Sequence, residues 1–263
     1  MEAQIKQNIN SSNILSYLSS KAVSVMVSNI SKSFGGNKVL SDLSLGVKPS
    51  ETLVILGKSG SGKSVLLKHI VGLLKPDKGN IYINGDDVTK SAGRKKHTIA
   101  VVFQSSALLN SLSVKENVAL YLTEHKIITD EQKISSLVSS CLSIVGLEGK
   151  ENIMPSELSG GMKKRVAVAR ALIMNPDLIL FDEPTAGLDP MLVGNIAELI
   201  NSLKKNVKVT QILVTHNVSL AAKTADRVAL LYNGKILKVS TFDEMRLSTE
   251  PEIRQFFDSN SIN

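Results

Sequence analysis

The sequence predicts an α/β fold built around a parallel sheet. Short, mostly apolar runs occur at residues 52–56, 99–103, 178–181 and 211–214. Runs of this length are typical of strands buried on both faces between layers of helices. Helix-period stretches separate the runs, as expected for crossovers between parallel strands. The chain has 263 residues, of which 43% are hydrophobic, so it can bury a sizeable core without disulfide or metal staples.

The chain before the first of these runs predicts a second, antiparallel sheet. Residues 1–22 are largely polar and rich in Asn and Ser, so we expect a flexible or weakly helical lead-in there. From Val25 onward, the alternating sequences VMVSNISKSF and VLSDLSLGV favour two antiparallel strands. We therefore expect a small antiparallel sheet ahead of the parallel core.

Two local signals place elements in the rest of the chain. Residues 129–132 (TDEQ) match a capping box, and apolar residues then follow on one helical face until Gly146. Cys141 lies on that face, so we expect a small buried hydrophobe and not a catalytic thiol. Near the end, RVALLYNGKILKVS predicts two strands joined by a turn at Asn233 and Gly234.

Composition and charge exclude several classes of protein. The single cysteine rules out an intramolecular disulfide and a cysteine-rich metal site, and it favours a reducing compartment. No apolar run is long enough to span a bilayer and the first twenty residues do not match a signal peptide, so we expect neither secretion nor membrane insertion. The net charge of +7 allows anionic partners, although the basic residues are scattered, as on solvated faces.

The clearest chemical signal is a glycine-rich segment directly after the first buried run. It reads GKSGSGKS, fits the pattern G-x-x-x-x-G-K-[ST] and precedes a helix-period stretch. Such glycines let backbone N–H groups curl around phosphates, and the start of the helix adds a favourable dipole. We expect Lys63 to reach the β- and γ-phosphates of ATP and Ser64 to bind Mg²⁺. The predicted nucleotide-binding residues are Gly57, Lys58, Ser59, Gly60, Ser61, Gly62, Lys63 and Ser64.

Two carboxylates follow the third buried run. Asp182 and Glu183 come directly after LILF, at the strand end where open parallel sheets bind ligands. We expect Asp182 to hold Mg²⁺, directly or through water, and Glu183 to orient and deprotonate the attacking water. Buried paired carboxylates without a cation would be costly, so a purely structural role is not expected. Together with the glycine-rich loop, these carboxylates predict a P-loop NTPase.

A third motif narrows this class. The sequence LSGGMKKR at residues 158–165 closely resembles the LSGGQ-like signature that precedes a helix in the nucleotide-binding subunits of ABC transporters. Ser159 is a good N-cap, while Gly160 and Gly161 leave backbone N–H groups free for an anion. Met162 replaces the glutamine of the general signature.

The remaining ABC motifs occur in the family's order, and the resemblance covers about residues 24–245. It implies that Phe34 stacks on adenine and that Gln104 links the Mg²⁺ site to the segment contacting the transporter. It also implies that His216 is the γ-phosphate switch histidine. Residues 186–189 match the loop that couples opposed sites, and Asp189 is in addition a good helix N-cap.

The resemblance implies a P-loop ABC-type ATPase core with an antiparallel β subdomain and an inserted helical subdomain. We expect the ATPase domain over residues 23–246, the helical subdomain at about 107–165 and a C-terminal tail over 247–263. One chain carries one P-loop and one signature, which in this family implies a homodimer with two composite ATP sites. We expect this dimer to dock under integral-membrane permease subunits and to have no nucleic-acid partner.

Several local sequences further resemble the ATPase subunits of Mla/Mce-type lipid transporters. These are GKSV, VVFQSSALLNSLSVKENV, LSGGMKKRVAVARAL and PEIRQFF. They imply phospholipid movement in the bacterial envelope, a lipid-binding accessory subunit and a peripheral location on the cytoplasmic face of the inner membrane. The alternatives are another importer or exporter, such as one for amino acids, and a soluble ATPase of Fe–S assembly. DNA-repair and translation ATPases are disfavoured, because their large insertions or second ATPase unit are missing.

One segment outside these motifs is a candidate docking site. In Ser105–Val118, we expect Leu108, Leu109 and Leu112 to be exposed and to line a groove for a permease helix, with core packing as an equal alternative.

The tail is a second candidate for a contact outside the motifs. In Glu252–Phe257, the residues Ile253, Phe256 and Phe257 fall on one helical face after Pro251. This face is expected to pack either on its own domain or on the partner protomer.

Overall fold

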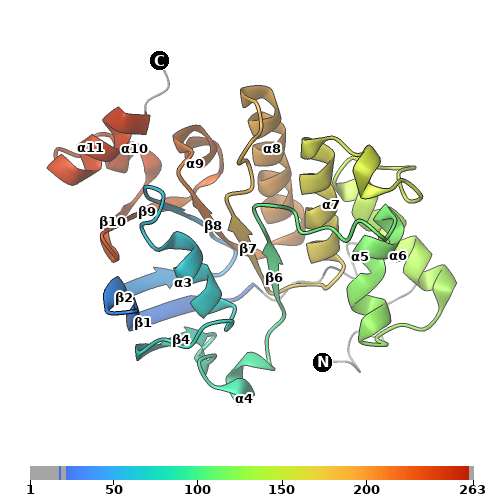
Figure 1. Ribbon diagram of the computed structural model, residues 1–263, viewed down its shortest axis with the longest axis horizontal. Helices are drawn as coiled ribbons and strands as arrows, with labels where there is room; N and C mark the ends of the chain where they lie inside the picture. Colours follow the sequence, from blue (N-terminus) through green and yellow to red (C-terminus); the bar gives the residue numbers. More distant parts are fainter. Residues whose placement is uncertain (1–17, 19–21, 261–263) are drawn as a thin grey trace.

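The computed structural model describes Leu18 and residues 22–260 of the chain (Figure 1). Apart from Leu18 and Ala22, the predicted lead-in lies outside the described residues, as do residues 261–263 of the predicted tail. Leu18 is buried among the apolar side chains of the main core. At this position the chain is therefore packed, where the sequence predicts a flexible or weakly helical segment.

A six-stranded sheet forms the centre of the molecule, in the order β10–β9–β3–β8–β7–β6. Its strands are β3 (Thr52–Leu56), β6 (Ile99–Val102), β7 (Leu178–Asp182), β8 (Thr210–Thr215), β9 (Arg227–Tyr232) and β10 (Lys235–Ser240). All neighbours are parallel except β10, which pairs antiparallel with β9 across the turn at Asn233 and Gly234. The predicted parallel sheet and C-terminal hairpin are confirmed.

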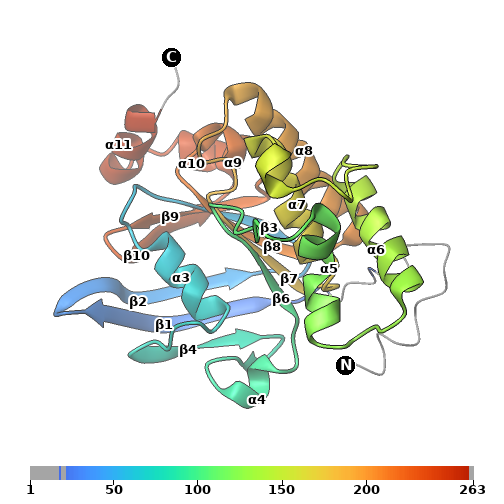
Figure 2. The same cartoon turned by 45° about the vertical axis from the view of Figure 1, so that its right-hand side comes forward.

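A second, four-stranded sheet is antiparallel and lies beside the first (Figure 2). It consists of β1 (Val25–Phe34), β2 (Asn37–Val47), β4 (Lys78–Ile83) and β5 (Asp86–Asp87). β1 pairs with both β2 and β4, which confirms the two strands predicted at the start of the chain. β4 is not predicted from the sequence, because its segment KGNIYI is polar in its first half and too short to show alternation.

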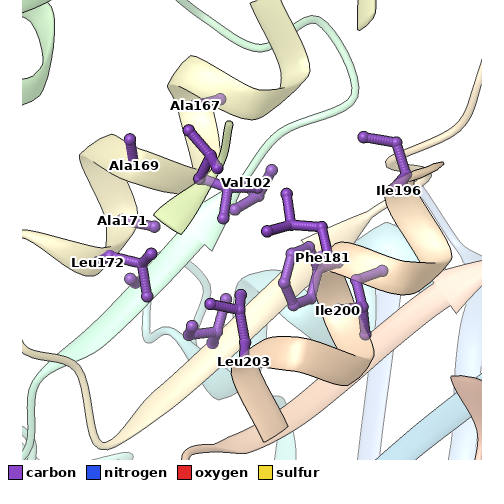
Figure 3. Close-up of a cluster of buried hydrophobic side chains, with 14 of the residues drawn as sticks. Val102, Ala167, Ala169, Ala171, Leu172, Phe181, Ile196, Ile200 and Leu203 are labelled. Atoms are coloured by element: carbon purple, nitrogen blue, oxygen red, sulfur yellow. The ribbon is translucent and has the colours of Figure 1, made fainter. Parts of the chain in front are cut away.

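Helices cover one face of the central sheet, and a helix with the second sheet covers the other. On the first face lie α7 (Gly160–Leu172), α8 (Pro190–Val207) and α9 (Val218–Thr224); on the second lies α3 (Lys63–Ile70). Successive side chains of β7 point to opposite faces of the sheet. Phe181 therefore packs in the core on the first face, and Leu180 packs in the core on the second face. Figure 3 shows the Phe181 ring among side chains of β6, α7 and α8.

The predicted helical subdomain corresponds to helices beyond the β6 edge of the central sheet (Figures 1 and 2). These are α5 (Val114–Glu124), α6 (Glu131–Ile144) and the first part of α7. α6 is capped by Asp130, whose carboxylate accepts from the backbone N–H groups of Gln132 and Lys133, so the predicted capping box at Thr129 is wrong. Cys141 of α6 is buried as predicted, and burial raises the pKa of its thiol to about 12.

Four short elements complete the fold, and two of them form the C-terminal end. They are α4 (Ser91–Arg94), the 3₁₀ helix η1 (Pro155–Glu157), α10 (Phe242–Arg246) and α11 (Pro251–Asn260). α11 presents Ile253, Phe256 and Phe257 to the main core, where all three are buried. The tail thus packs on its own domain in this single chain, which is the first of the two alternatives that the sequence leaves open.

Candidate nucleotide-binding site

The glycine-rich loop connects β3 to α3, so the predicted P-loop has its required strand–loop–helix setting. Gly62, the residue before α3, has φ 104°, in the left-handed region that glycine adopts without strain. At Gly57, a Cβ would lie 2.6 Å from the Leu231 carbonyl oxygen, which leaves no room for a side chain. Ser61 Oγ is buried and, among the described residues, has no hydrogen-bond partner. A loop whose glycines allow this tight backbone and which keeps a buried hydroxyl without a partner fits a phosphate ligand.

Lys63 is the first residue of α3, and its ammonium group lies at the centre of this loop. Its Nζ donates to the carbonyl oxygens of Gly57 at 2.8 Å and Lys58 at 3.1 Å. The same Nζ lies 3.4 Å from Glu183 Oε1, and both side chains are largely buried. The cation is therefore held between the loop backbone and the carboxylate at the end of β7.

Ser64 and Asp182 meet beside the loop. The Ser64 hydroxyl donates to Asp182 Oδ1 at 2.9 Å. Burial raises the pKa of Asp182, the hydrogen bond from Ser64 opposes this shift, and the nearby Glu183 carboxylate adds to it. A bound cation would stabilise the ionised form of Asp182. A hydroxyl and a carboxylate beside a phosphate loop fit Mg²⁺, which takes few protein oxygens and completes its shell with phosphate and water.

Glu183 leaves β7 with a left-handed backbone, φ 46°, and its carboxylate is held at both oxygens. Oε2 accepts from Thr215 Oγ1 at 2.9 Å and from the His216 N–H at 3.3 Å. His216 Nδ1 lies 3.0 Å from Oε1. Thr215, the last residue of β8, is a contact that sequence reasoning missed. The pairing of β7 with β8 brings these side chains together, so the only signal was their equivalent place at neighbouring strand ends.

These groups surround a cavity of about 580 Å³ at the carboxyl edge of the central sheet. The predicted site residues that line it are Lys58, Ser59, Gly60, Gly62, Lys63, Ser64, Gln104, Glu183 and His216. The structure thus brings together four predicted motifs that are far apart in the sequence, namely the glycine-rich loop, Gln104, Glu183 and His216. The cavity is also lined by Val39 of β2 and by Ser259 and Asn260 of α11, none of which was predicted from the sequence.

Helix α7 holds the segment that follows Gln104. The buried Lys164 donates through Nζ to the Gln104 carbonyl oxygen. Arg170 donates to the carbonyl oxygens of Ala107 at 2.6 Å and Ser106 at 2.8 Å. Burial lowers the pKa of both cations. No sequence pattern predicts this connection, because charged residues on a helix are usually solvated.

The leucines of segment 105–118 differ from one another in exposure. Leu109 is 45% exposed, as predicted. Leu108 is only partly buried but packs against the main core, and Leu112 is half-buried beside α5 and α6. The prediction that all three are exposed is therefore wrong for Leu108 and Leu112, which the adjacent helices cover.

The signature and the coupling loop lie side by side, away from the cavity. Ser159 caps α7 and accepts from the Met162 N–H at 3.3 Å. Asp189 caps α8 and accepts from the Leu192 N–H at 3.0 Å, so both predicted N-caps are confirmed. A Cβ added at Gly160 would lie 3.6 Å from Leu188, and one at Gly161 would lie 3.5 Å from Leu192. A single chain does not bring these residues to the P-loop.

Phe34 also lies outside the cavity. It ends β1 at the tip of the hairpin with β2, and it is 44% exposed. The Lys32 ammonium group lies 5.5 Å from the centre of its ring. The ring is therefore exposed at the tip of the antiparallel sheet.

The family model described as ABC transporter matches residues 40–186, which run from β2 through the P-loop and the signature to the coupling loop. The chain belongs to the ABC transporter family. This cassette is therefore an ATP-binding and ATP-hydrolysing subunit, as predicted from the sequence.

Three curated relatives span most of the cassette. One, from Arabidopsis thaliana, is the chloroplastic protein TRIGALACTOSYLDIACYLGLYCEROL 3, which is 42% identical and covers 87% of this chain and 71% of its own. A probable ribonucleotide transport ATP-binding protein, mkl, from Mycobacterium tuberculosis is 37% identical, covering 91% and 68%. The intermembrane phospholipid transport system ATP-binding protein MlaF from Haemophilus influenzae is 36% identical, covering 90% and 91%.

Solved ABC cassettes share this fold. A dimeric cassette in a post-hydrolysis state with ADP and phosphate is 32% identical, with a TM-score of 0.74 over 83% of this chain and 98% of that chain. A nucleotide-free cassette from an ABC transporter is 27% identical, with a TM-score of 0.78 over 89% and 98%. No helix among the described residues of this cassette is long and apolar enough to cross a membrane.

Proposed function

We propose that this cassette supplies the ATP hydrolysis that moves phospholipid between membranes of a bacterial envelope. The observation that carries the proposal is the Haemophilus influenzae relative, which is named for intermembrane phospholipid transport and which matches 90% of this chain. The local sequences that resemble Mla/Mce-type ATPases support the same cargo. We further propose a peripheral position on the cytoplasmic face of the inner membrane, under permease subunits and a lipid-binding accessory subunit.

Within the cavity, we assign the phosphates of ATP to the loop and to Lys63. The free Ser61 hydroxyl and the glycine backbone support this assignment, since both suit an anion. Mg²⁺ would be held by Ser64, Asp182 and Gln104, and when bound it would neutralise charge on the phosphates. Phe34 remains our candidate for adenine stacking, which requires the tip of the β1–β2 hairpin to approach the nucleotide.

We assign the role of general base to Glu183. Thr215 and the His216 N–H both donate to Oε2, which orients the carboxylate at the cavity wall. Oε1 then has Lys63 and the His216 ring beside it. Removing a proton from water requires an acceptor within hydrogen-bond reach, and Glu183 is the acidic side chain that lines the cavity in the described part of the chain. We assign His216 to the γ-phosphate.

Each complete site would need two copies of the chain. Ser159, Gly160, Gly161 and Asp189 lie away from the cavity of their own chain. The start of α7 offers N–H groups that suit an anion, and a second copy would bring them to the γ-phosphate of the first. The relative solved as a dimer with ADP and phosphate supports this homodimer.

The cargo is tested by isolating the cassette with its permease from native membranes and reconstituting the complex in phospholipid vesicles. We expect ATP-dependent transfer of a labelled phospholipid to acceptor vesicles, and no transfer with Glu183→Gln. Relatives are also named for ribonucleotide and for sulfate or thiosulfate transport. ATP-dependent uptake of either solute, without lipid transfer, would overturn the phospholipid assignment.

A further inference from the structure

The C-terminal helix contributes side chains to the cavity that no family motif covers. Ser259 and Asn260, in the last turn of α11, line the cavity together with Val39 and Lys58. In Figures 1 and 2, α11 lies beside the loop that leads into α3. The segment PEIRQFF, which begins this helix, therefore has a place next to the nucleotide site.

The last turn is held firmly, so its position is set by the fold. Phe256 and Phe257 are buried, and the Phe257 ring packs edge-on against Phe242 of α10 with centroids 5.9 Å apart. Lys238 of β10 forms an ion pair with Glu250 at 3.0 Å, directly before the helix starts. These contacts fix α11 along its length.

The hydrogen bonds of the last turn of α11 use its side-chain donors but leave the side-chain oxygen of Asn260 without a donor among the described residues. Ser259 Oγ donates to the Phe256 carbonyl oxygen at 3.0 Å. Asn260 Nδ2 donates to the same carbonyl at 2.7 Å and to Ser259 Oγ at 3.2 Å, which uses both of its hydrogens. No described residue donates to Asn260 Oδ1. The turn therefore offers the cavity a hydrogen-bond acceptor.

The acceptor Asn260 Oδ1 can bind only a ligand group that donates a hydrogen bond. The C-terminal end of a helix carries partial negative charge, which disfavours phosphate and favours a donor. The P-loop side of the cavity suits the phosphates, and the next group along a nucleotide is the ribose, whose hydroxyls are donors. Val39 gives the cavity an apolar surface, whereas Phe34, the residue expected at adenine, lies outside the cavity.

We propose that Asn260 belongs to the nucleotide site and that its Oδ1 accepts a hydrogen bond from a ribose hydroxyl. This specificity-determining contact rests on the nucleotide site proposed above. It gives the C-terminal helix a part in nucleotide recognition by its own chain.

The test compares ADP with 2′-deoxy-ADP and 3′-deoxy-ADP by calorimetric titration of the full chain. One neutral hydrogen bond predicts that Asn260→Ala weakens ADP binding roughly three- to tenfold. Wild-type protein should bind one deoxy analogue more weakly by a similar factor, and Asn260→Ala should bind that analogue and ADP equally. Gln255→Ala, an exposed change on the same helix outside the cavity, is the matched control and should bind like wild type.

Two further results would overturn the inference. Unchanged ADP affinity in Asn260→Ala would exclude the contact, and an equal loss for all three nucleotides would exclude the ribose as its partner. Lys63→Ala separates these failures from failure of the site. If wild type binds ADP and Lys63→Ala does not, the P-loop site stands and only the contribution of Asn260 is refuted. If wild type does not bind ADP, the proposed site and this inference both fail.

Discussion

Glu183 combines backbone strain with a fixed side chain. A left-handed backbone at a residue with a side chain costs about 1–2 kcal/mol, so it persists only where surrounding contacts compensate. Here the Glu183 N–H donates to the Val214 carbonyl at 2.9 Å, while Thr215 and His216 hold the carboxylate. The turn takes the chain out of β7 directly at the cavity. A residue placed in this way is suited to a reaction that needs one exact orientation.

We predict that Glu183→Gln lowers ATP hydrolysis about 10²–10⁴-fold while ATP still binds, because general-base assistance is worth that much in rate. Gln keeps the shape and one accepting oxygen, so the contact with Thr215 can remain. Hydrolysis and ATP-dependent dimerisation are measured together, with the permease present. ATP should hold the Glu183→Gln dimer closed. Near-normal hydrolysis would refute Glu183 as the base, and lost ATP binding would show a structural role.

At Cys141, burial leads to a prediction about pH. In the folded chain the pKa of this thiol is about 12, above its ordinary value of 9.0, so ionisation favours the unfolded chain. The free energy of unfolding should not depend on this thiol below about pH 9 and should fall above it, by at most about 1.4 kcal/mol per pH unit. We expect Cys141→Ala to remove this part of the pH dependence between pH 9 and 11 in urea titrations.

The same burial predicts slow thiol chemistry in the folded protein. A thiol-specific reagent should react with Cys141 only in denaturant, since the thiolate is the nucleophile and the group is inaccessible. Rapid reaction of the native protein at neutral pH would contradict the packing of α6 described above.

Among the elements, α7 connects the signature to the cavity. Its first residues follow Ser159, and its middle carries Lys164 and Arg170, which hold the backbone after Gln104. Gln104 itself lines the cavity. A shift of α7 would therefore move the Gln104 segment with it. This helix thus links the signature mechanically to the cavity.

We predict that Lys164→Met loosens the Gln104 segment and lowers ATP hydrolysis several-fold, with ADP affinity nearly unchanged. The lost contact is a charge-assisted hydrogen bond, worth about 1.5–3 kcal/mol where the donor is buried. Lys163→Met on the same helix is the control, because Lys163 has no hydrogen bond or ion pair through its side chain in the described structure. ATP hydrolysis is measured by phosphate release. Equal rates for the Lys164→Met and Lys163→Met variants would contradict this role of Lys164.

The second element with a consequence of its own is α11. Phe256 is 1% exposed within the core of its own chain. We predict that Phe256→Ala lowers the free energy of unfolding by about 3–5 kcal/mol, the cost of removing a buried phenyl ring. Phe34→Ala, at an exposed ring, should change it by less than about 0.5 kcal/mol. Equal small effects in urea titrations would show that α11 is not part of the domain's core.

At the scale of the whole molecule, α3, which follows the P-loop, and the helices α5 and α6 lie at different places along the central sheet (Figure 1). The segment after Gln104 runs from the cavity toward α5, and Leu109 is exposed on it. An exposed leucine in this position suits a partner that senses the state of the cavity. The permease is the partner we expect there.

We predict that Leu109→Cys crosslinks to cysteines placed in cytoplasmic loops of the permease, in the background Cys141→Ala. Leu247→Cys, equally apolar and 73% exposed but near α10 at the other end of the molecule, should not crosslink to the same loops. Crosslinking is read on gels after oxidation of the purified complex. Failure of several Leu109→Cys pairs in an intact complex would place the docking surface elsewhere.

Contiguous patterns made most of the fold and much of the site predictable from the sequence. The buried strands are apolar runs, and the phosphate loop, Lys63 and Ser64 occupy one stretch of chain. Asp182 is the last residue of its strand and Glu183 follows it directly, so the strand itself predicts that both lie at the sheet edge. Local chemistry determines such features, because glycine torsions, strand burial and helix caps depend on neighbouring residues.

Contacts between distant segments were decided only by the tertiary structure. Thr215 meets Glu183 because β8 pairs with β7, and Lys164 meets Gln104 because α7 packs beside β6. Asn260 reaches the cavity because three buried side chains dock α11 on the core. Each of these residues is an ordinary polar side chain in its own stretch of sequence. Its role arises when long-range packing brings together groups whose separation along the chain carries no local signal.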